Sequence, residues 1–172
     1  MPDPAALASA LDGMDAVVSG LGARSASDSG VAARGTRAIV EAMQAAHVRR
    51  IVVVSAAPIS TVASPGRPNP PSQDPGEGLV MRNVLTPLIK IVLREHYADL
   101  ALMEDTLRDS GLDWTIVRPP RLTDGPLIGS YRTAVGHNLR RGLHISRADV
   151  AHLMLCMLEQ PQTIGQAIGV AY

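Results

Sequence analysis

The stretch Arg50-Ile51-Val52-Val53-Val54-Ser55 decides the fold class of this chain. Its four consecutive β-branched apolar residues favour a strand buried on both faces, as strands of parallel sheets are. Shorter apolar runs at 15–19, 114–117 and 167–170 predict three more strands, and helical patterns lie between them. This alternation predicts an α/β fold with a parallel sheet and right-handed crossovers.

Helical patterns are expected over 4–12, 30–46, 96–110 and 146–159. Ser146 is expected to cap the last helix, with Asp149 near the positive end of its dipole. Residues 121–145 are expected to form a loop and a hairpin-like excursion. In the helix over 30–46, the residues expected to face inward recur at helical spacing: Val31, Gly35, Ala38, Ile39, Ala42 and Met43.

Composition narrows the class of protein. The 172 residues suit one domain, and 16 basic against 16 acidic residues disfavour nucleic acid or an anionic membrane as main partners. No apolar run reaches the roughly 20 residues that a membrane span needs, and the N-terminus does not resemble a signal peptide. The single cysteine, Cys156, excludes an intrachain disulfide and suits a cytoplasmic location. The five histidines lack metal-ligand spacing, so no metal site is expected.

Residues 58–79 are rich in Pro, Gly and Ser, and include Pro65-Gly66, Pro70-Pro71 and Pro75-Gly76. A loop this long is unusual in a compact domain. Two interpretations are open, a functional lid or a disordered segment.

The segment Gly20-Leu21-Gly22-Ala23-Arg24-Ser25 follows the first predicted strand and nearly matches the dinucleotide fingerprint G-x-G-x-x-G. Ser25 stands where the third glycine should be, and the next strand lacks the expected acid at its end. The fingerprint interpretation is therefore disfavoured. A glycine-rich turn and a close approach of the backbone to a ligand both remain open.

Two further groups of residues end predicted strands, where open α/β sheets bind ligands. Ser55 either faces that crevice or caps the strand end through its own backbone. It has no G-x-S-x-G context and is not expected to be an activated nucleophile. In Arg118-Pro119-Pro120-Arg121, the prolines fix the exit of the chain and leave carbonyls free. Arg118 is expected in a structural ion pair, whereas Arg121 either reaches a phosphate or acidic substrate or is solvated.

Several segments recur in the same order in the atypical short-chain dehydrogenase/reductases: 15–22, 35–43, 52–56, 107–119 and 145–151. The chain resembles this family, above all its biliverdin reductase B (flavin reductase)-like and NmrA-like members. The resemblance implies a partial Rossmann-like, doubly wound parallel sheet with helices on both faces, whose strands are equivalent to the fourth to seventh. It implies one domain over 1–172 that is N-terminally incomplete, because family members begin with a strand and a phosphate-binding glycine-rich loop.

The resemblance also implies NADP or NAD as cofactor, with Ser55 orienting the nicotinamide or a proton-bearing water. The implied function is reduction of a planar acceptor such as a flavin or quinone, under a lid at 58–79. The alternatives are a non-catalytic NAD(P)-binding redox sensor and an inactive truncated product. Without the phosphate loop, weak NAD(P)H binding and self-association through the edge of strand 15–19 are expected. The implied cofactor-binding residues are Gly20, Leu21, Gly22, Ala23, Arg24, Ser55, Ala56, Pro119, Pro120, Arg121 and Leu122.

Overall fold

A twisted sheet with strand order β1-β2-β3-β7-β5 forms the centre of the computed structural model, which describes residues 4–23, 28–76 and 93–172. β1, β2, β3 and β7 run parallel, and β5 joins the sheet antiparallel to β7. The predicted parallel α/β sheet is therefore confirmed. The strands are β1 (Ala16–Ser19), β2 (Arg50–Val54), β3 (Asp113–Arg118), β5 (Arg132–Val135) and β7 (Gln166–Ala171).

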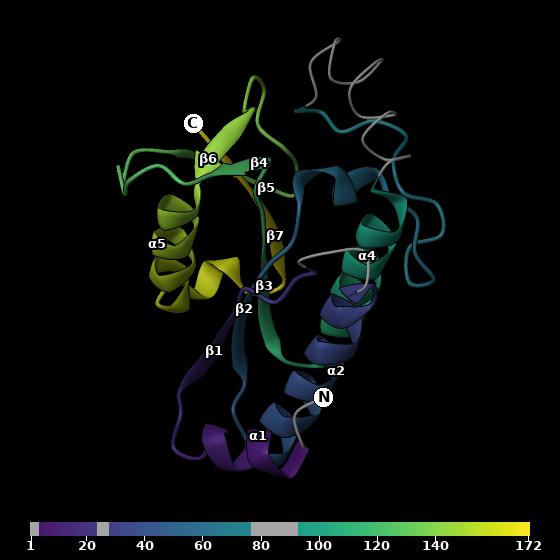
Figure 1. The fold of residues 1–172 in the computed structure, drawn as a ribbon, viewed down its shortest axis with the longest axis vertical. Coiled ribbons are helices and arrows are strands. Elements are labelled where there is room, and N and C mark those ends of the chain that lie inside the picture. The colour runs from purple at the N-terminus through teal and green to yellow at the C-terminus, as the bar shows by residue number, and fades with distance from the viewer. Residues whose placement is uncertain (1–3, 24–27, 77–92) are drawn as a thin grey trace.

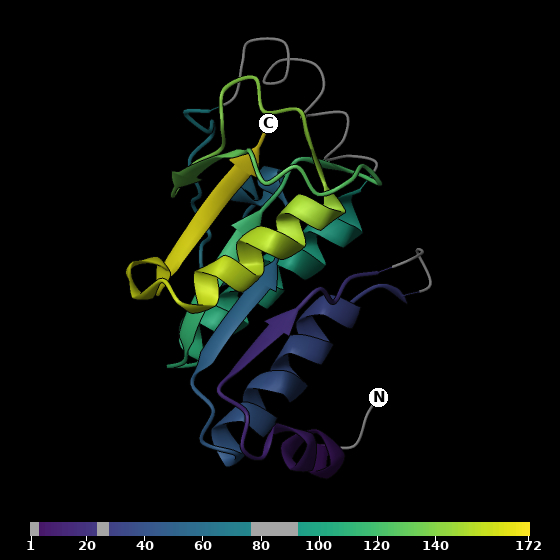
Figure 2. The same cartoon turned by 90° about the vertical axis from the view of Figure 1, so that its left-hand side faces the viewer.

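Helices cover both faces of this sheet (Figures 1 and 2). α2 (Val31–Ala45) and α4 (Arg94–Asp109) lie on one face and α5 (Arg147–Leu158) on the other, while α1 (Pro4–Leu11) packs against α2. Two short 3₁₀ helices, η2 (Ala57–Thr61) and η4 (Pro161–Thr163), follow β2 and α5. In the described residues, no helix combines the length and apolar character that a membrane crossing requires.

The alternating side chains of β2 divide the core into two layers. Ile51 and Val53 pack with α2 and α4, for example against Met43 and Met103, and all four are fully buried. Val52 points to the other face, into the cluster that includes Met154 of α5. The prediction that this strand is buried on both faces is confirmed, because each face of the sheet has its own helical cover.

The inward face of α2 differs from the predicted stripe. Ala38, Ala42 and Met43 are buried as expected, but Gly35 and Ile39 are only partly buried. The reason is that α2 contacts α4 and α1, so its buried surface is wider than a single stripe. The buried residues of α2 are Ala32, Ala33, Thr36, Ala38, Val40, Ala42 and Met43.

Residues 121–145 do not form the expected hairpin-like excursion. β4 (Arg121–Thr123) pairs in parallel with β6 (His144–Ser146) in a separate two-stranded sheet, and the intervening β5 joins the main sheet. A parallel pair needs a long connection between its strands, and residues 124–143 provide it. The alternation of side chains along the sequence did not reveal that β4 pairs with β6 and β5 with β7.

The buried carboxylate of Asp149 holds this region together. One of its oxygens accepts hydrogen bonds from the amides of Ile128 and Gly129, at 3.1 and 2.7 Å. The other accepts from the hydroxyls of Ser146, at 2.9 Å, and of Tyr172. The hydroxyl of Ser146 in turn accepts from the Asp149 amide, so the predicted cap of α5 is confirmed. Burial would raise the pKa of Asp149, but these four hydrogen bonds outweigh it and lower the pKa from 3.8 to about 2.

The low pKa of Asp149 predicts a stability contribution that depends on pH. Because the folded-state pKa lies below the unfolded value, the contribution is fully present above about pH 4 and is lost as the pH falls toward about 2. We expect Asp149→Asn to be less stable than the wild type at pH 6, and this difference to shrink at pH 3. Urea midpoints of both proteins across this range measure the effect.

The exposed Asp124 offers a control, because Asp124→Asn removes a surface carboxylate that pairs with the exposed Arg147. This variant should follow the wild type at every pH. A stability difference between Asp149→Asn and the wild type that stays constant from pH 6 to pH 3 would contradict the assignment.

The free edge of β1 predicts self-association. Within the described residues β1 pairs with β2 on one side only, and Val18 on this strand is 43% exposed. We expect the wild type to form dimers or larger species in sedimentation velocity, and Val18→Lys to shift the population toward monomer. Leu155→Lys, on the exposed side of α5, controls for the added charge. A monodisperse wild-type monomer would show this expectation to be wrong.

Candidate functional site

The three loops predicted to bind a cofactor follow neighbouring parallel strands. They therefore leave the sheet at the same edge, the one formed by the carboxyl ends of these strands (Figure 1). The loops after β2 and β3 are hydrogen-bonded to each other. The Ser55 amide donates to the carbonyl of Val117 at 2.7 Å, and the Ala57 amide donates to that of Pro119 at 2.9 Å. The Pro119 carbonyl is therefore occupied, contrary to the expectation that it would be free. Gly20, Leu21, Gly22 and Ala23 follow β1 directly, whereas Arg24 lies outside the described residues.

The first loop leaves open space beside its two glycines. Gly20 and Gly22 are exposed, and a Cβ atom added to either would have no atom of the described residues within 4 Å. Leu21 has a packing role instead, since a Cβ on Gly35 of α2 would lie 2.1 Å from its Cδ2 atom. Packing thus explains Gly35 but not Gly20 or Gly22, and a ligand that runs along this edge would meet bare backbone at both positions.

The N-terminus of α2 is already occupied by a carboxylate of the protein. Asp99 on α4 accepts hydrogen bonds from the amides of Ala32 and Ala33, at 3.0 and 2.9 Å. In a dinucleotide fingerprint, the helix that follows the glycines offers these amides to the pyrophosphate. Here the carboxylate of Asp99 occupies the position that a pyrophosphate would take in such a fingerprint. This contact disfavours the fingerprint interpretation of residues 20–25, as the sequence does.

Ser55 belongs to a buried ionic cluster. Its hydroxyl donates to Glu104 Oε1 at 2.7 Å and does not cap its own strand. Arg118 donates to both oxygens of Glu104, from Nε at 2.9 Å and from Nη2 at 2.5 Å. Arg108 adds a bond to Oε2 at 2.6 Å. The structural ion pair predicted for Arg118 is therefore confirmed, and its partner is Glu104.

Sequence reasoning missed Glu104, which is fully buried. Burial would raise the pKa of this carboxyl, but the bonds and charges of Arg118 and Arg108, with the Ser55 hydroxyl, lower it. A signal was available, since Glu104 follows Met103 and precedes Leu107 on the inner face of the predicted helix. An acid on an apolar face requires a partner.

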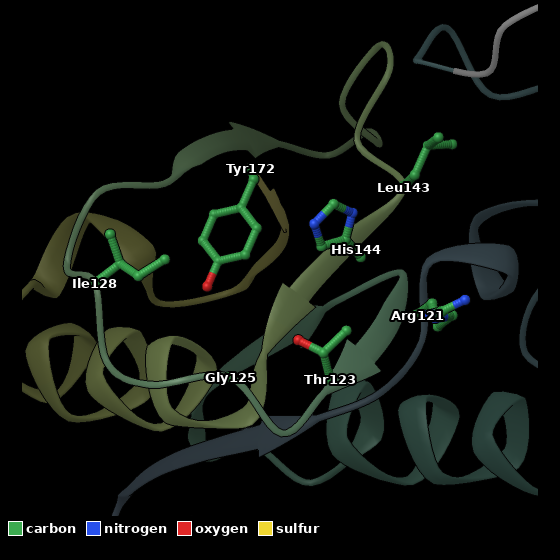
Figure 3. A pocket seen from close by; sticks show the side chains of 7 residues that line it. All are labelled: Arg121, Thr123, Gly125, Ile128, Leu143, His144 and Tyr172. Carbon is green, nitrogen blue, oxygen red and sulfur yellow. The ribbon is translucent and has the colours of Figure 1, made fainter.

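Arg121 lies at the start of β4 and is exposed, while Leu122 beside it is partly buried. Arg121 lines a pocket of about 500 Å³. Figure 3 shows the rings of His144 and Tyr172 side by side, with Arg121 toward the other end. The two rings meet edge to face with centroids 5.4 Å apart. The pocket is lined by Arg121, Thr123, Gly125, Ile128, Leu143, His144 and Tyr172. A cation, apolar surface and two flat rings therefore lie where the loop after β3 ends.

The described part of the predicted lid, residues 58–76, is fastened at two points. Asp105 of α4 accepts hydrogen bonds from the Ser64 hydroxyl and the Gly66 amide, both at 2.9 Å. Asp74 accepts from the amides of Gly76 and Asn138, at 2.8 and 2.9 Å. This segment therefore bridges α4 and the connection between β5 and β6; residues 77–79 lie outside the described residues.

Potential metal ligands do not gather near these loops. Across 4–23, 28–76 and 93–172, no three His, Cys, Asp or Glu side chains are placed to hold a metal ion. His152 instead shares a hydrogen bond of 2.7 Å with the Tyr131 hydroxyl.

Solved structures with a similar fold include an oxidoreductase, YlbE, from Lactococcus lactis, with 20% identity and a TM-score of 0.73 over 99% of this chain and 67% of that one. A short-chain dehydrogenase/reductase from Veillonella parvula, solved with NADP, has 20% identity and a TM-score of 0.72 over 99% and 68%. A candidate NADH-flavin reductase from Streptococcus pneumoniae has 22% identity and a TM-score of 0.69 over 99% and 78%. At these identities the likeness shows the fold, which is Rossmann-like.

Family membership rests on a different match. The family model described as NAD(P)H-binding matches residues 1–161. That range includes all three strand-end loops, the Glu104 cluster and every residue that lines the pocket except Tyr172. It also extends over most of the chain, including α5. The chain therefore belongs to the NAD(P)H-binding family.

Proposed function

We propose that this protein is an NAD(P)H-dependent reductase whose acceptor is a planar molecule with an anionic group, such as flavin mononucleotide. The observation that carries the proposal is the adjacency of two features. The loops after β1, β2 and β3 share one edge of the sheet, and the pocket that Arg121 lines begins where the third loop ends. A cofactor on the edge and an acceptor in the pocket would then be neighbours.

The comparisons support an NAD(P)H-binding oxidoreductase. The family binds NAD(P)H, one structural neighbour was solved with NADP, and another is a candidate NADH-flavin reductase. The single cysteine is compatible with a cytoplasmic enzyme. Discrimination between NADP and NAD depends on groups that bind the adenosine end of the cofactor.

The residues would divide the work as follows. Gly20, Leu21, Gly22, Ala23 and Arg24 would hold the cofactor after β1, and Ser55 with Ala56 would face the nicotinamide. Pro119 and Pro120 would form the wall between nicotinamide and acceptor, because their rings fix the backbone. Arg121 and Leu122 would begin the acceptor pocket. A bound reduced nicotinamide would supply the hydride, and the protein would position and shield it.

Consumption of NADPH or NADH with flavin mononucleotide tests the proposal. We expect oxidation of the reduced nucleotide, followed at its absorbance band, that depends on both the protein and the acceptor. Binding of the nucleotide without turnover of flavins or quinones would favour a non-catalytic NAD(P)-binding sensor instead. Absence of nucleotide binding would refute the proposal for this chain.

Arg121 provides the sharpest test of the acceptor class. Its guanidinium can hold a carboxylate or phosphate through two parallel hydrogen bonds, or stack on a flat ring. We expect Arg121→Ala to lower kcat/KM for flavin mononucleotide about tenfold, the loss of one charge-assisted contact. The kcat/KM for a neutral quinone should change much less, so the ratio of the two constants reports the contact.

Arg147→Ala is the matched control, because it removes the same charge from an exposed arginine that does not line the pocket. This variant should keep the wild-type ratio, and both variants should keep the wild-type melting temperature, since exposed arginines contribute little stability. Equal ratios in the wild type and Arg121→Ala would mean that Arg121 is solvated and does not contact the acceptor.

A further inference from the structure

The direction of one hydrogen bond limits what Ser55 can do. A serine hydroxyl has a single proton, and that of Ser55 is donated to Glu104 Oε1 over 2.7 Å. The oxygen keeps its capacity to accept. Ser55 stands at the carboxyl end of β2 and retains an exposed fraction of 8%, so a ligand at this edge meets an acceptor, not a donor.

Glu104 holds this direction firmly. Arg118 engages both of its oxygens and Arg108 engages Oε2, so the carboxylate cannot turn away from Ser55 without breaking charge-assisted bonds. Its lowered pKa keeps it ionised, and an ionised carboxylate only accepts hydrogen bonds. Reversal of the Ser55 hydroxyl would therefore remove one of the two hydrogen bonds that Oε1 of this fully buried carboxylate accepts.

We infer that Glu104, clamped by Arg118, is a positioning residue that makes Ser55 an obligate hydrogen-bond acceptor for the carboxamide N–H of the nicotinamide. The inference rests on the proposed function, because it assumes a nicotinamide at this edge. It also departs from the expectation that Ser55 handles a proton-bearing water. With its proton committed to Glu104, Ser55 orients the ring by accepting from it, and proton transfer belongs to another group or to solvent.

An analogue that lacks the N–H provides the test. In the 3-acetylpyridine analogue of NADPH, a methyl group replaces the carboxamide nitrogen and the carbonyl remains. We expect the wild-type protein to bind NADPH about three- to tenfold more tightly than this analogue, the worth of one hydrogen bond. Calorimetric or fluorescence titration gives the ratio of the two dissociation constants without reference to turnover.

Two variants and a control show whether Ser55 and Glu104 cause the difference in affinity between NADPH and the analogue. Ser55→Ala should bring the ratio close to one. Glu104→Gln should lower it as well, because a glutamine amide can donate to Ser55 and free the hydroxyl proton. Asp105→Asn changes the same charge at the next position of α4, but Asp105 binds residues 64 and 66 instead of Ser55, so the ratio should be preserved.

The outcomes distinguish the role inferred for Ser55 from the proposed function. If the wild type binds NADPH and the analogue equally well, or if Ser55→Ala keeps the wild-type ratio, the inference is overturned while the proposed function stands. If the wild type binds neither nucleotide, both are overturned. Should Glu104→Gln not fold, the Ser55→Ala ratio decides the acceptor role, and Glu104→Asp, which shortens the acid but keeps its charge, should lower the ratio by withdrawing the carboxylate from Ser55.

Discussion

The ion pair between Glu104 and Arg118 is the interaction on which the geometry of the site depends. It joins α4 to β3 by two hydrogen bonds in a fully buried position, and the Ser55 hydroxyl extends it to the end of β2. A buried charge that loses its partner costs about 3–5 kcal/mol, so neither residue can be removed alone. The helix and the two strand ends are therefore fixed relative to each other before any ligand binds.

Other loops around this end of the sheet are also held by carboxylates that accept hydrogen bonds. Asp99 caps α2, Asp105 and Asp74 fasten residues 58–76, and Asp149 secures the loop at residues 128 and 129. Each carboxylate accepts two or more hydrogen bonds, mostly from backbone amides that a strand or helix does not satisfy. Loops carried on such supports keep their shape before any ligand is present.

The residue pattern predicted the sheet well because four β-branched residues at 51–54 leave few alternatives to a buried strand. The strand-end loops followed, since parallel strands put their carboxyl ends at one edge. The parallel pairing of residues 121–123 with 144–146 could not be foreseen, because it depends on Asp149 and Tyr172, which meet only in the folded chain. Glu104 differs in part: an acid on an apolar helix face is visible in the sequence, but its partners Ser55 and Arg118 on other elements are not. Long-range polar contacts leave no periodic trace in a sequence.

The distribution of charge at the edge also bears on what can bind there. An isolated Glu104 beside a nucleotide would repel its phosphates, and a low-dielectric surrounding would strengthen that repulsion. The positive charges of Arg118 and Arg108 balance the negative charges of Glu104 and Asp105, so these four residues together are neutral. The negative charge of Asp99 is likewise bound by hydrogen bonds from two amides of α2. Arg121 is exposed at the start of β4, whereas Arg118 is buried, so Arg121 is the one of these two arginines that a solute can reach. The same turn of chain thus pairs one arginine with a buried acid and leaves the other exposed.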